Sequence, residues 1–444
     1  MTECTGQEVL FSIGKKKVTT VFDGGKLTSD SGVLFLNRVD ERLGLSGRMA
    51  GALLDPRQEG KVLHSLRDLL RQRLFQIALG YEDVNDANSL RFDPAFQAAL
   101  DRVPGPGEVL ASQPTLSRLE ERISRRELMA FSGLLVEFFV ERLKRMRRAA
   151  RRKIILDFDS TADPTHGAQQ LTMFHGYYDQ WQYLPLLVFS GGWPIAAVLR
   201  PGNAHDSWGA VAVLRRIVER IWEEFPKAEI QLRADAGFAV PELYEFCEAA
   251  GISYLIGQIT NSRLVRRARP WMKKAKRISQ KTGEKAKVFG SFKHRAKSWE
   301  KSRRIIAKAE VLPLGENPRF VATNMEGDPA SLYDFYTDRG EMENRIKDLK
   351  NALSADRLSC SRFLSNQFRL LLHVAAYILM FCLRENLQKT PLASAQMDTL
   401  RLKLLKIGAK VVTSARRVWF HLASAHPAAP IWNLLAQRLA RAPA

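Results

Sequence analysis

Three aspartates in two apolar segments could together hold a divalent cation. Asp157 and Asp159 lie in KIILDFDST, whose apolar residues predict a buried strand. Side chains alternate along a strand, so both carboxylates point to one face, where they are costly unless they bind something. Asp235 ends a second such segment, EIQLRAD, and Gly237 after it permits a tight turn. Ligand sites in α/β proteins favour the carboxyl ends of strands, and carboxylate oxygens suit a hard divalent cation.

The segment YTDRGEMENRIKDLK adds a glutamate with basic neighbours at helical spacing. Arg339, Glu343 and Lys350 are spaced so that they lie near one side of a helix. Lys347 lies on that side too, and Tyr336 comes three residues before Arg339. An apolar stripe runs beside them, formed by Met342, Ile346, Leu349 and Leu353. Taken alone, the pattern also describes an ordinary amphipathic helix with Glu–Lys pairs.

Strands and helices alternate in the part of the chain that carries these residues. Strands are expected over 153–161, 183–190 and 193–200, with Gly191-Gly192 as a hairpin turn. A helix over 206–225, a strand over 229–235, a helix over 241–251 and a strand over 253–259 follow. After an insertion, a helix is expected to begin near Asp338. This order matches a ribonuclease-H-like core, whose first three strands form an antiparallel meander, although order alone fits several α/β folds.

The positive charge of the chain is concentrated in that insertion. The 444 residues include 68 Lys and Arg against 47 Asp and Glu, a formal net charge of +21. Residues 261–308 hold eighteen of the basic residues and two of the acids. Such a one-sign cluster favours a polyanionic partner, most often nucleic acid, over a merely solvated surface. Trp299, Arg303 and Arg304 lie in the cluster, and Trp299, like Trp271, suits either base stacking or the core of a small β-subdomain.

Several classes of protein are excluded or disfavoured. The four cysteines are far apart, which excludes a disulfide framework and any CxxC motif. Neither a GxxxxGK[ST] phosphate loop nor an HExxH motif is present. The longest apolar run, 370–383, is too short for a bilayer and predicts a buried helix, and no signal peptide is apparent. We expect a cytoplasmic protein, associated with DNA rather than with a membrane.

The spacing Tyr336-x2-Arg339-x3-Glu343-x6-Lys350 resembles the signature of bacterial insertion-sequence transposases of the DDE type. LDFDST and LRADAGF resemble the strands that carry the two aspartates of that family. Stretches such as LTSDSGVLFL and LRPGNAHD are similar to one insertion-sequence group, related to piggyBac-type elements, so the resemblance covers nearly the whole chain.

The resemblance implies a catalytic and metal-binding triad of Asp159, Asp235 and Glu343. Asp159 is preferred because the acid of the family is followed by a small residue and Thr, and Asp157 remains the alternative. Two Mg²⁺ ions, for which Mn²⁺ can substitute, would serve phosphodiester hydrolysis and strand transfer. Arg339, Lys347, Lys350 and Tyr336 would contact DNA phosphates. The implied partners are the terminal inverted repeats of a transposon, target DNA and a second copy of the chain.

These observations predict five regions and one function. The regions are a mostly helical DNA-binding region over 1–150, the first part of the catalytic core over 151–260, a basic, β-rich insertion over 261–325, the second part of the core over 326–390 and a C-terminal region over 391–444. Within the first, LASQPTLSRLEERISR is a candidate helix-turn-helix with its turn at Gln113-Pro114. The predicted function is cut-and-paste DNA transposition. The alternatives are a metal-dependent nuclease without strand transfer and an inactive DNA-binding protein.

Overall fold

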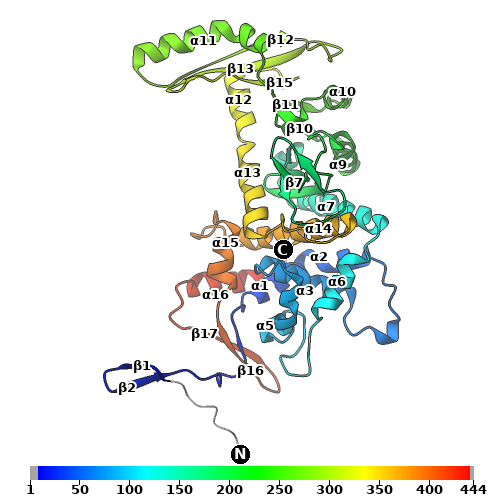
Figure 1. The fold of residues 1–444 in the computed structure, drawn as a ribbon, viewed down its shortest axis with the longest axis vertical. Helices are drawn as coiled ribbons and strands as arrows, with labels where there is room; N and C mark the ends of the chain where they lie inside the picture. The colour runs from blue at the N-terminus through cyan, green and yellow to red at the C-terminus, as the bar shows by residue number, and fades with distance from the viewer. Residues whose placement is uncertain (1–8, 441–444) are drawn as a thin grey trace, which may run out of the picture. The chain divides into compact units, whose positions relative to one another are not determined.

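The computed structural model describes residues 9–440 of the chain, which forms two compact units (Figure 1). Unit one comprises Met1–Leu119 and Leu379–Ala444, and unit two comprises Glu120–Ile378. The boundaries of these two units differ from those of the five regions expected from the sequence. The helix α7 (Arg125–Arg145), which was expected to close the N-terminal region, belongs to unit two because its apolar face packs on strand β9 (Trp193–Val198) and helix α9 (Ala210–Glu224).

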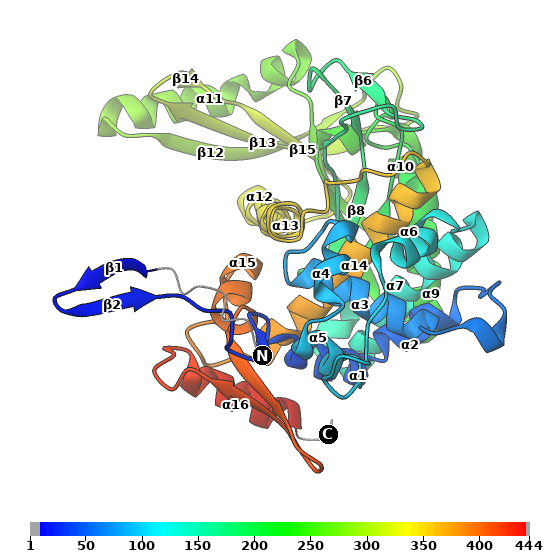
Figure 2. The same cartoon turned by 60° about the horizontal axis from the view of Figure 1, so that its bottom comes forward.

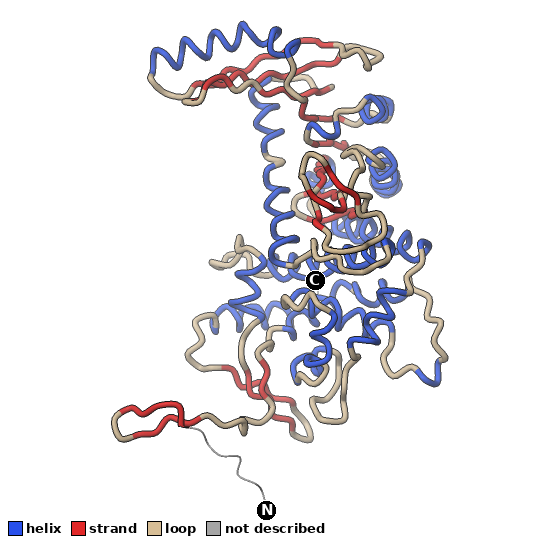
Figure 3. Tube along the Cα trace, in the orientation of Figure 1, coloured by secondary structure: helices blue, strands red, loops and turns tan. Residues whose placement is uncertain are grey.

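Unit one is mostly helical, as predicted (Figure 3). Its larger helices are α1 (Val33–Leu43), α2 (Leu45–Gly51), α3 (Leu66–Ala78) and α16 (Ala429–Ala440). A small sheet joins the two ends of the chain in the order β17 (Val418–Leu422), β16 (Ala409–Thr413), β3 (Leu27–Thr28). Ser65 begins α3 with a capping box, in which its hydroxyl accepts the Asp68 N–H and its own N–H donates to the Asp68 carboxylate.

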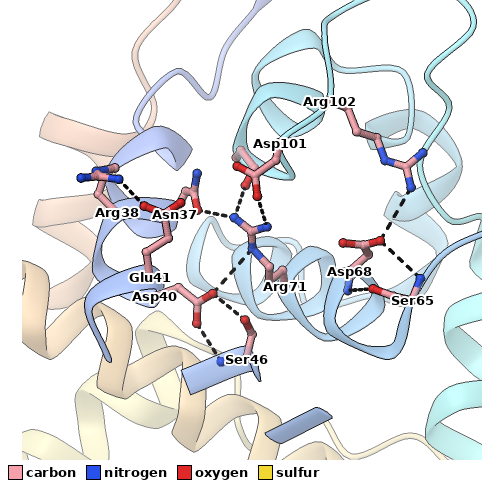
Figure 4. Close-up of polar contacts among 11 residues, drawn as sticks. Asn37, Arg38, Asp40, Glu41, Ser46, Ser65, Asp68, Arg71, Asp101 and Arg102 are labelled. Carbon is pink, nitrogen blue, oxygen red and sulfur yellow. Dashed lines mark hydrogen bonds and ion pairs between the residues drawn. The ribbon is translucent and has the colours of Figure 1, made fainter. Parts of the chain in front are cut away.

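A fully buried arginine lies inside unit one (Figure 4). Arg71 of α3 donates to Asp101 at 2.6 Å and to the carbonyl of Ala99 at 2.9 Å, and it also bonds Asn37. Its Nε lies 3.6 Å from Asp40 of α1, which in turn accepts the backbone N–H and the hydroxyl of Ser46. The arginine therefore ties together α1, α3 and the chain after α5 (Pro94–Ala99).

The predicted helix-turn-helix is not formed as expected. Helix α6 (Gln113–Glu121) begins at Gln113 itself, so Gln113-Pro114 is its first turn and no helix directly precedes it. Proline is tolerated in the first helical turn because the N–H groups there have no partner within the helix. The residues before it, 108–112, form neither helix nor strand.

Unit two is built on a nine-stranded mixed sheet. Its strands follow the order β12-β13-β15-β11-β10-β4-β8-β9, with β14 paired to β13. The central strands are β4 (Lys153–Ser160), β8 (Leu186–Ser190), β9, β10 (Glu229–Ala234) and β11 (Ser253–Gln258). Strands β4, β8 and β9 form the expected antiparallel meander, and β10 runs parallel to both β4 and β11. Helices α9 and α10 (Pro241–Ala249) are the crossovers that return the chain from β9 to β10 and from β10 to β11.

The basic insertion begins with a long helix that the sequence analysis did not predict. Helix α11 (Ser262–Thr282) is capped by Asn261, whose side chain accepts the N–H groups of Arg263 and Leu264. Its buried side chains are small or apolar and recur every three or four residues, namely Leu264, Ala268, Met272 and Ala275. The many cations between them hide this stripe.

The strands of the insertion extend the central sheet instead of forming a separate subdomain. They are β12 (Ala286–His294), β13 (Arg303–Leu312), β14 (Gly315–Glu316) and β15 (Arg319–Thr323). β15 pairs antiparallel with β11, and β13 with β15. Helix α11 packs along β12 and β13 (Figure 2).

Among the described residues, one helix is long and apolar enough to cross a membrane by length and composition. This helix, α14 (Phe363–Glu385), contains the apolar run at 370–383, and 83% of its most apolar window is buried inside the protein. Such burial is typical of a core helix. The three cysteines among the described residues, Cys247, Cys360 and Cys382, are free thiols, and Cys4 lies outside those residues.

Candidate active site

The register of β4 and β10 brings the two predicted aspartates side by side. The strands are parallel, with Asp157 opposite Arg233 and Phe158 opposite Ala234, so Asp159 and Asp235 occupy the next position. Asp235 directly follows β10 and caps a short turn, where its carboxylate accepts the Gly237 N–H at 3.0 Å. Both carboxylates therefore lie at the carboxyl ends of central strands, as expected.

The glutamate arrives from a helix that begins earlier than predicted. Helix α12 (Pro329–Thr337) starts at Asp328, whose carboxylate accepts the Ser331 N–H, and Pro329 stands at its first position. Helix α13 (Gly340–Lys347) follows with Asp338 and Arg339 still helical, so Tyr336 and Glu343 lie on nearly continuous helix (Figure 1). The DPAS sequence carried this start signal, which the analysis missed.

Arg339 links the carboxylates. It donates to Asp159 Oδ2 at 3.0 Å and lies 3.7 Å from Glu343 Oε1, one helical turn away. Asp235 also interacts electrostatically with Arg339, with Asp159 and with Glu343. Arg339 thus contacts Asp159 and Glu343, and Asp235 is close enough to interact electrostatically with all three.

Negative charge at this point is not fully compensated. Burial, with a smaller contribution from the neighbouring Asp235, raises the pKa of Asp159 from 3.8 to about 7, and Arg339 opposes this shift. The pKa of Asp235 is also raised by burial, with contributions from Asp206 and Glu343. A pair of buried carboxylates with raised pKa values is typical of a functional site.

Asp157 has a different environment from Asp159. It accepts two hydrogen bonds from Arg233, at 2.6 and 2.8 Å, and both side chains are buried. Arg233 also donates to the carbonyl of Phe335 in α12 at 2.7 Å. The Asp157–Arg233 pair therefore connects the strands of Asp159 and Asp235 to the helix that leads to Glu343. Because the Asp157 carboxylate is already paired with Arg233, Asp159 is favoured over the alternative, Asp157, as the metal ligand.

The basic and phenolic residues of the predicted signature surround the acids. Tyr336 interacts with the side chain of Arg339, and its hydroxyl fits against Gly257 of β11, where a Cβ would lie only 2.8 Å away. Lys350, in the π-turn Asp348–Ala352, donates to the carbonyl of Ala162 at 2.6 Å. An open pocket is lined by Asp159, Glu343, Lys347 and Lys350, among others.

Two residues at the site were not singled out from the sequence. Asp206 follows β9 and packs directly against Gly237, where any Cβ would overlap its carboxylate. Arg200 is buried, and it donates to the Ser160 hydroxyl at 2.8 Å and to the Asp206 carbonyl at 2.6 Å. Burial lowers the pKa of Arg200 to about 10. Both residues lie in LRPGNAHD, a stretch singled out only for its resemblance to the family, and the helix expected from residue 206 begins after Gly209 instead.

The structure contradicts the roles expected of Trp299 and Arg303. Trp299 is 5% exposed, with its ring against Tyr244 of α10 and the guanidinium of Arg303. Arg303 is buried and forms a bidentate pair with Glu248. Neither can face DNA in this arrangement, because the strand β13 joins the central sheet and turns them toward α10. They pack the core, which was the alternative reading of Trp299.

Arg304 and Trp271 are engaged elsewhere within the same segment. Arg304 donates to the carbonyls of Met325 and Gly327 at 2.9 and 2.7 Å. Trp271 stacks on Phe292 with a ring separation of 6.0 Å, and Gly290 leaves room for its indole on β12. The remaining cations of α11 are mostly exposed.

The donor set fits a hard divalent cation by its chemistry. Asp159, Asp235 and Glu343 offer only oxygen ligands, and burial raises the pKa of Asp159, whose charged form a bound cation would favour. Among residues 9–440, no three His, Cys, Asp or Glu side chains are gathered closely enough to hold an ion. In this arrangement the positive charge that Asp159 and Glu343 contact is that of Arg339.

The family model described as Transposase DDE domain group 1 matches residues 11–444. No curated protein matches the chain.

Proposed function

The chain belongs to the transposase DDE domain family, group 1, and we propose that it cuts DNA at transposon ends and joins them to target DNA. The observation that carries the proposal is the contact of Arg339 with both Asp159 and Glu343, together with the adjacent positions of Asp159 and Asp235 at the carboxyl ends of β4 and β10. The membership of a transposase family makes DNA the partner, and the carboxylates supply the chemistry.

The arrangement of the central strands supports a ribonuclease-H-like catalytic core. The order β9-β8-β4-β10-β11, with an antiparallel meander followed by parallel crossovers, is the one expected for that fold. The segments 261–325 would then be an insertion between the core's last strand, β11, and the helices that carry Glu343. The assignment accounts for the long separation between Asp235 and Glu343.

The three acids would hold Mg²⁺, or Mn²⁺ in its place. Bound divalent ions supply Lewis acidity at the phosphorus centre and stabilise charge on the departing oxygen. Arg339, whose guanidinium donates to Asp159 here, would donate to two oxygens of a phosphate in bidentate fashion. Lys347 and Lys350 line the adjacent pocket and would bind phosphates beside the bond that is cut. Tyr336, held against Gly257, would orient Arg339.

The exposed cations of α11 would bind the DNA backbone. Lys273, Lys274 and Arg277 project from the exposed side of this helix, opposite its buried stripe. Phosphate neutralisation by such residues releases counterions and gives affinity without sequence preference. We further propose that two copies of the chain act together, one on each transposon end.

A strand-transfer assay tests the proposal. A labelled transposon end is incubated with the protein, Mg²⁺ and a supercoiled target plasmid, and the products are resolved on a gel. Label joined to the plasmid supports transposition. Cleaved ends without joined product indicate a nuclease, and bound but uncut ends indicate an inactive DNA-binding protein. Sedimentation of the protein–DNA complex measures whether it contains two copies.

A further inference from the structure

The chain between β4 and β8 carries a cluster of exposed aromatic rings that the proposed chemistry does not use. It forms a small sheet in the order β5 (Asp163–Pro164), β7 (Gln180–Tyr183), β6 (Met173–His175) (Figure 2). Tyr177 is 86% exposed, Trp181 57%, Phe174 48% and Tyr178 40%. Phe174 contacts Trp181 edge-on, and Tyr177 contacts Tyr178 in the same way. We call these four residues the aromatic cluster.

The segment that bears the cluster is anchored rather than loose. Gln170 donates its N–H to the carbonyl of Ser361 at 2.9 Å and accepts the Phe363 N–H at 3.1 Å. The Tyr183 hydroxyl donates to the carbonyl of Gln170 at 2.7 Å. Gly202 packs so closely on the backbone of β6 and β7 that any Cβ there would overlap it. Exposed apolar rings on an anchored segment are typical of a surface that binds a partner.

The cluster lies close to the catalytic acids. Gly202, beneath β6 and β7, is in the same loop as Asp206, which packs on the turn after Asp235. Burial raises the pKa of Tyr178, and the carboxylates of Asp206, Asp159 and Asp235 add to the effect. Tyr178, at one edge of the aromatic cluster, therefore lies near the carboxylates.

The charge of the segment indicates which part of DNA it meets. Residues 161–183 contain no Lys or Arg, while Arg339, Lys347 and Lys350 surround the acids. Phosphates would therefore be held by those cations, and the uncharged rings beside them suit the bases attached to the same strand. A base inside a duplex presents no open face, so the occupant must be unstacked.

We propose that the aromatic cluster binds an unpaired DNA base next to the bond that the acids cut. The proposal rests on the proposed function, because it needs DNA at the acids. It gives the role once expected of Trp299 to rings that are exposed, chiefly Trp181 and Tyr178.

The test compares two labelled DNA probes in EDTA, where no cleavage occurs. One is a blunt duplex, and the other is the same duplex with a short single-stranded overhang. We expect the protein to bind the overhang probe more tightly, by roughly 5- to 150-fold, which is the range that stacking of one base supplies. Replacing the overhang bases by abasic sites should remove this preference, which requires no protein variant.

Variants then locate the stacking surface. Trp181→Ala and Tyr178→Ala should lose the preference and keep the blunt-duplex affinity, whereas Trp181→Phe should retain most of it. Leu171→Ala is the matched control, since Leu171 is an exposed apolar residue of the same segment without a ring. Melting temperatures verify that each variant folds.

Four outcomes overturn the proposal, and the last of them contradicts the proposed function too. An abasic overhang that binds as tightly as the normal one contradicts stacking. An unchanged preference in the Trp181→Ala and Tyr178→Ala variants places the base elsewhere, and an equal loss on both probes means that the rings contact duplex DNA. Failure to bind either probe contradicts the proposed function as well.

Discussion

Two arginines, one in each unit, lie between carboxylates, but their surroundings differ. Arg71 of unit one meets Asp40 and Asp101, and Asp40 gains two further hydrogen bonds from Ser46. Burial raises the pKa of Asp40, and these donors, together with Arg71, oppose it. Arg339 of unit two faces three carboxylates, and Asp159 accepts besides it only the N–H of Ser160.

The difference separates a structural cluster from a reactive one. Among the causes that shift the pKa of Asp40, no second carboxylate is prominent, whereas Asp235 raises the pKa of Asp159 and Glu343 that of Asp235. A stable interior avoids such repulsion, because each like charge within a low dielectric destabilises the ionised forms. A bound cation, as the proposed function requires, would relieve this repulsion.

The largest expected effect is on cleavage by the three acids. Asp159→Asn, Asp235→Asn and Glu343→Gln each remove a ligand charge with little change in volume. We expect each to lower the rate of DNA cleavage by roughly 10³-fold or more, with DNA affinity within a few fold of wild type. Glu341→Gln is the matched control on α13, because Glu341 is exposed and pairs only loosely with Arg345. Normal cleavage by Glu343→Gln would contradict the assignment.

For the cluster around Arg71, we expect substitution to change stability. Arg71→Ala leaves Asp40 buried without its cation and should lower the free energy of unfolding by about 3–5 kcal/mol. Denaturant unfolding measures this change. The control is Arg38→Ala, which removes an exposed pair with Glu41 and should cost at most about 1 kcal/mol. Equal losses of unfolding free energy in the two variants would mean that the buried pair contributes no more to stability than the exposed one.

The Asp157–Arg233 pair should behave as structural although it neighbours the active site. Asp157→Asn keeps the shape but removes the charge opposite Arg233, so we expect a loss of about 2–3 kcal/mol in unfolding free energy. Cleavage should fall much less than in Asp159→Asn, since the ligand itself remains. A variant that unfolds like wild type but does not cleave would move the catalytic role to Asp157.

The raised pKa of Asp159 predicts an unusual pH dependence in EDTA. Between its usual value of 3.8 and about 7, the unfolded chain loses this proton while the folded chain keeps it. The stability of unit two should therefore fall as pH rises through that window, by up to about 1.4 kcal/mol per pH unit for this one proton. Asp159→Asn should flatten the curve, and parallel curves for variant and wild type would contradict the raised pKa.

The smallest effect is expected from single cations of α11. Replacing Lys273, Lys274 and Arg277 by Gln should weaken DNA binding and reduce the slope of log K against log salt by about 0.9 for each lost phosphate contact. Binding measured at several salt concentrations gives the slope. An unchanged slope would show that this side of α11 faces something other than DNA.

The order of the core and the acids of the site were predictable because they follow local rules. Apolar runs located β4 and β10, and alternation placed Asp157 and Asp159 on one face. Helical spacing joined Arg339 to Glu343, and the structure has them within 3.7 Å. Each of these inferences needs only residues that are near one another along the chain.

The features that the sequence could not predict depend on contacts between residues that are distant along the chain. Alternation along a strand cannot show that Arg233 donates hydrogen bonds to Asp157, because Arg233 lies on another strand. The pattern of charges in the insertion concealed the buried stripe of α11 and the pairing of Arg303 with Glu248. Exposed aromatic residues at 174–181 carried no motif, and only the folded chain shows that they lie near Asp206 and the catalytic acids.

Mn²⁺ binding, measured by electron paramagnetic resonance on wild type, Asp159→Asn and Asp157→Asn, tests the central claim most directly. The two variants make the same chemical change two residues apart on one strand. The account predicts that wild type and Asp157→Asn bind Mn²⁺ and that Asp159→Asn loses the tight sites. Undiminished binding by Asp159→Asn, or a loss confined to Asp157→Asn, would contradict it.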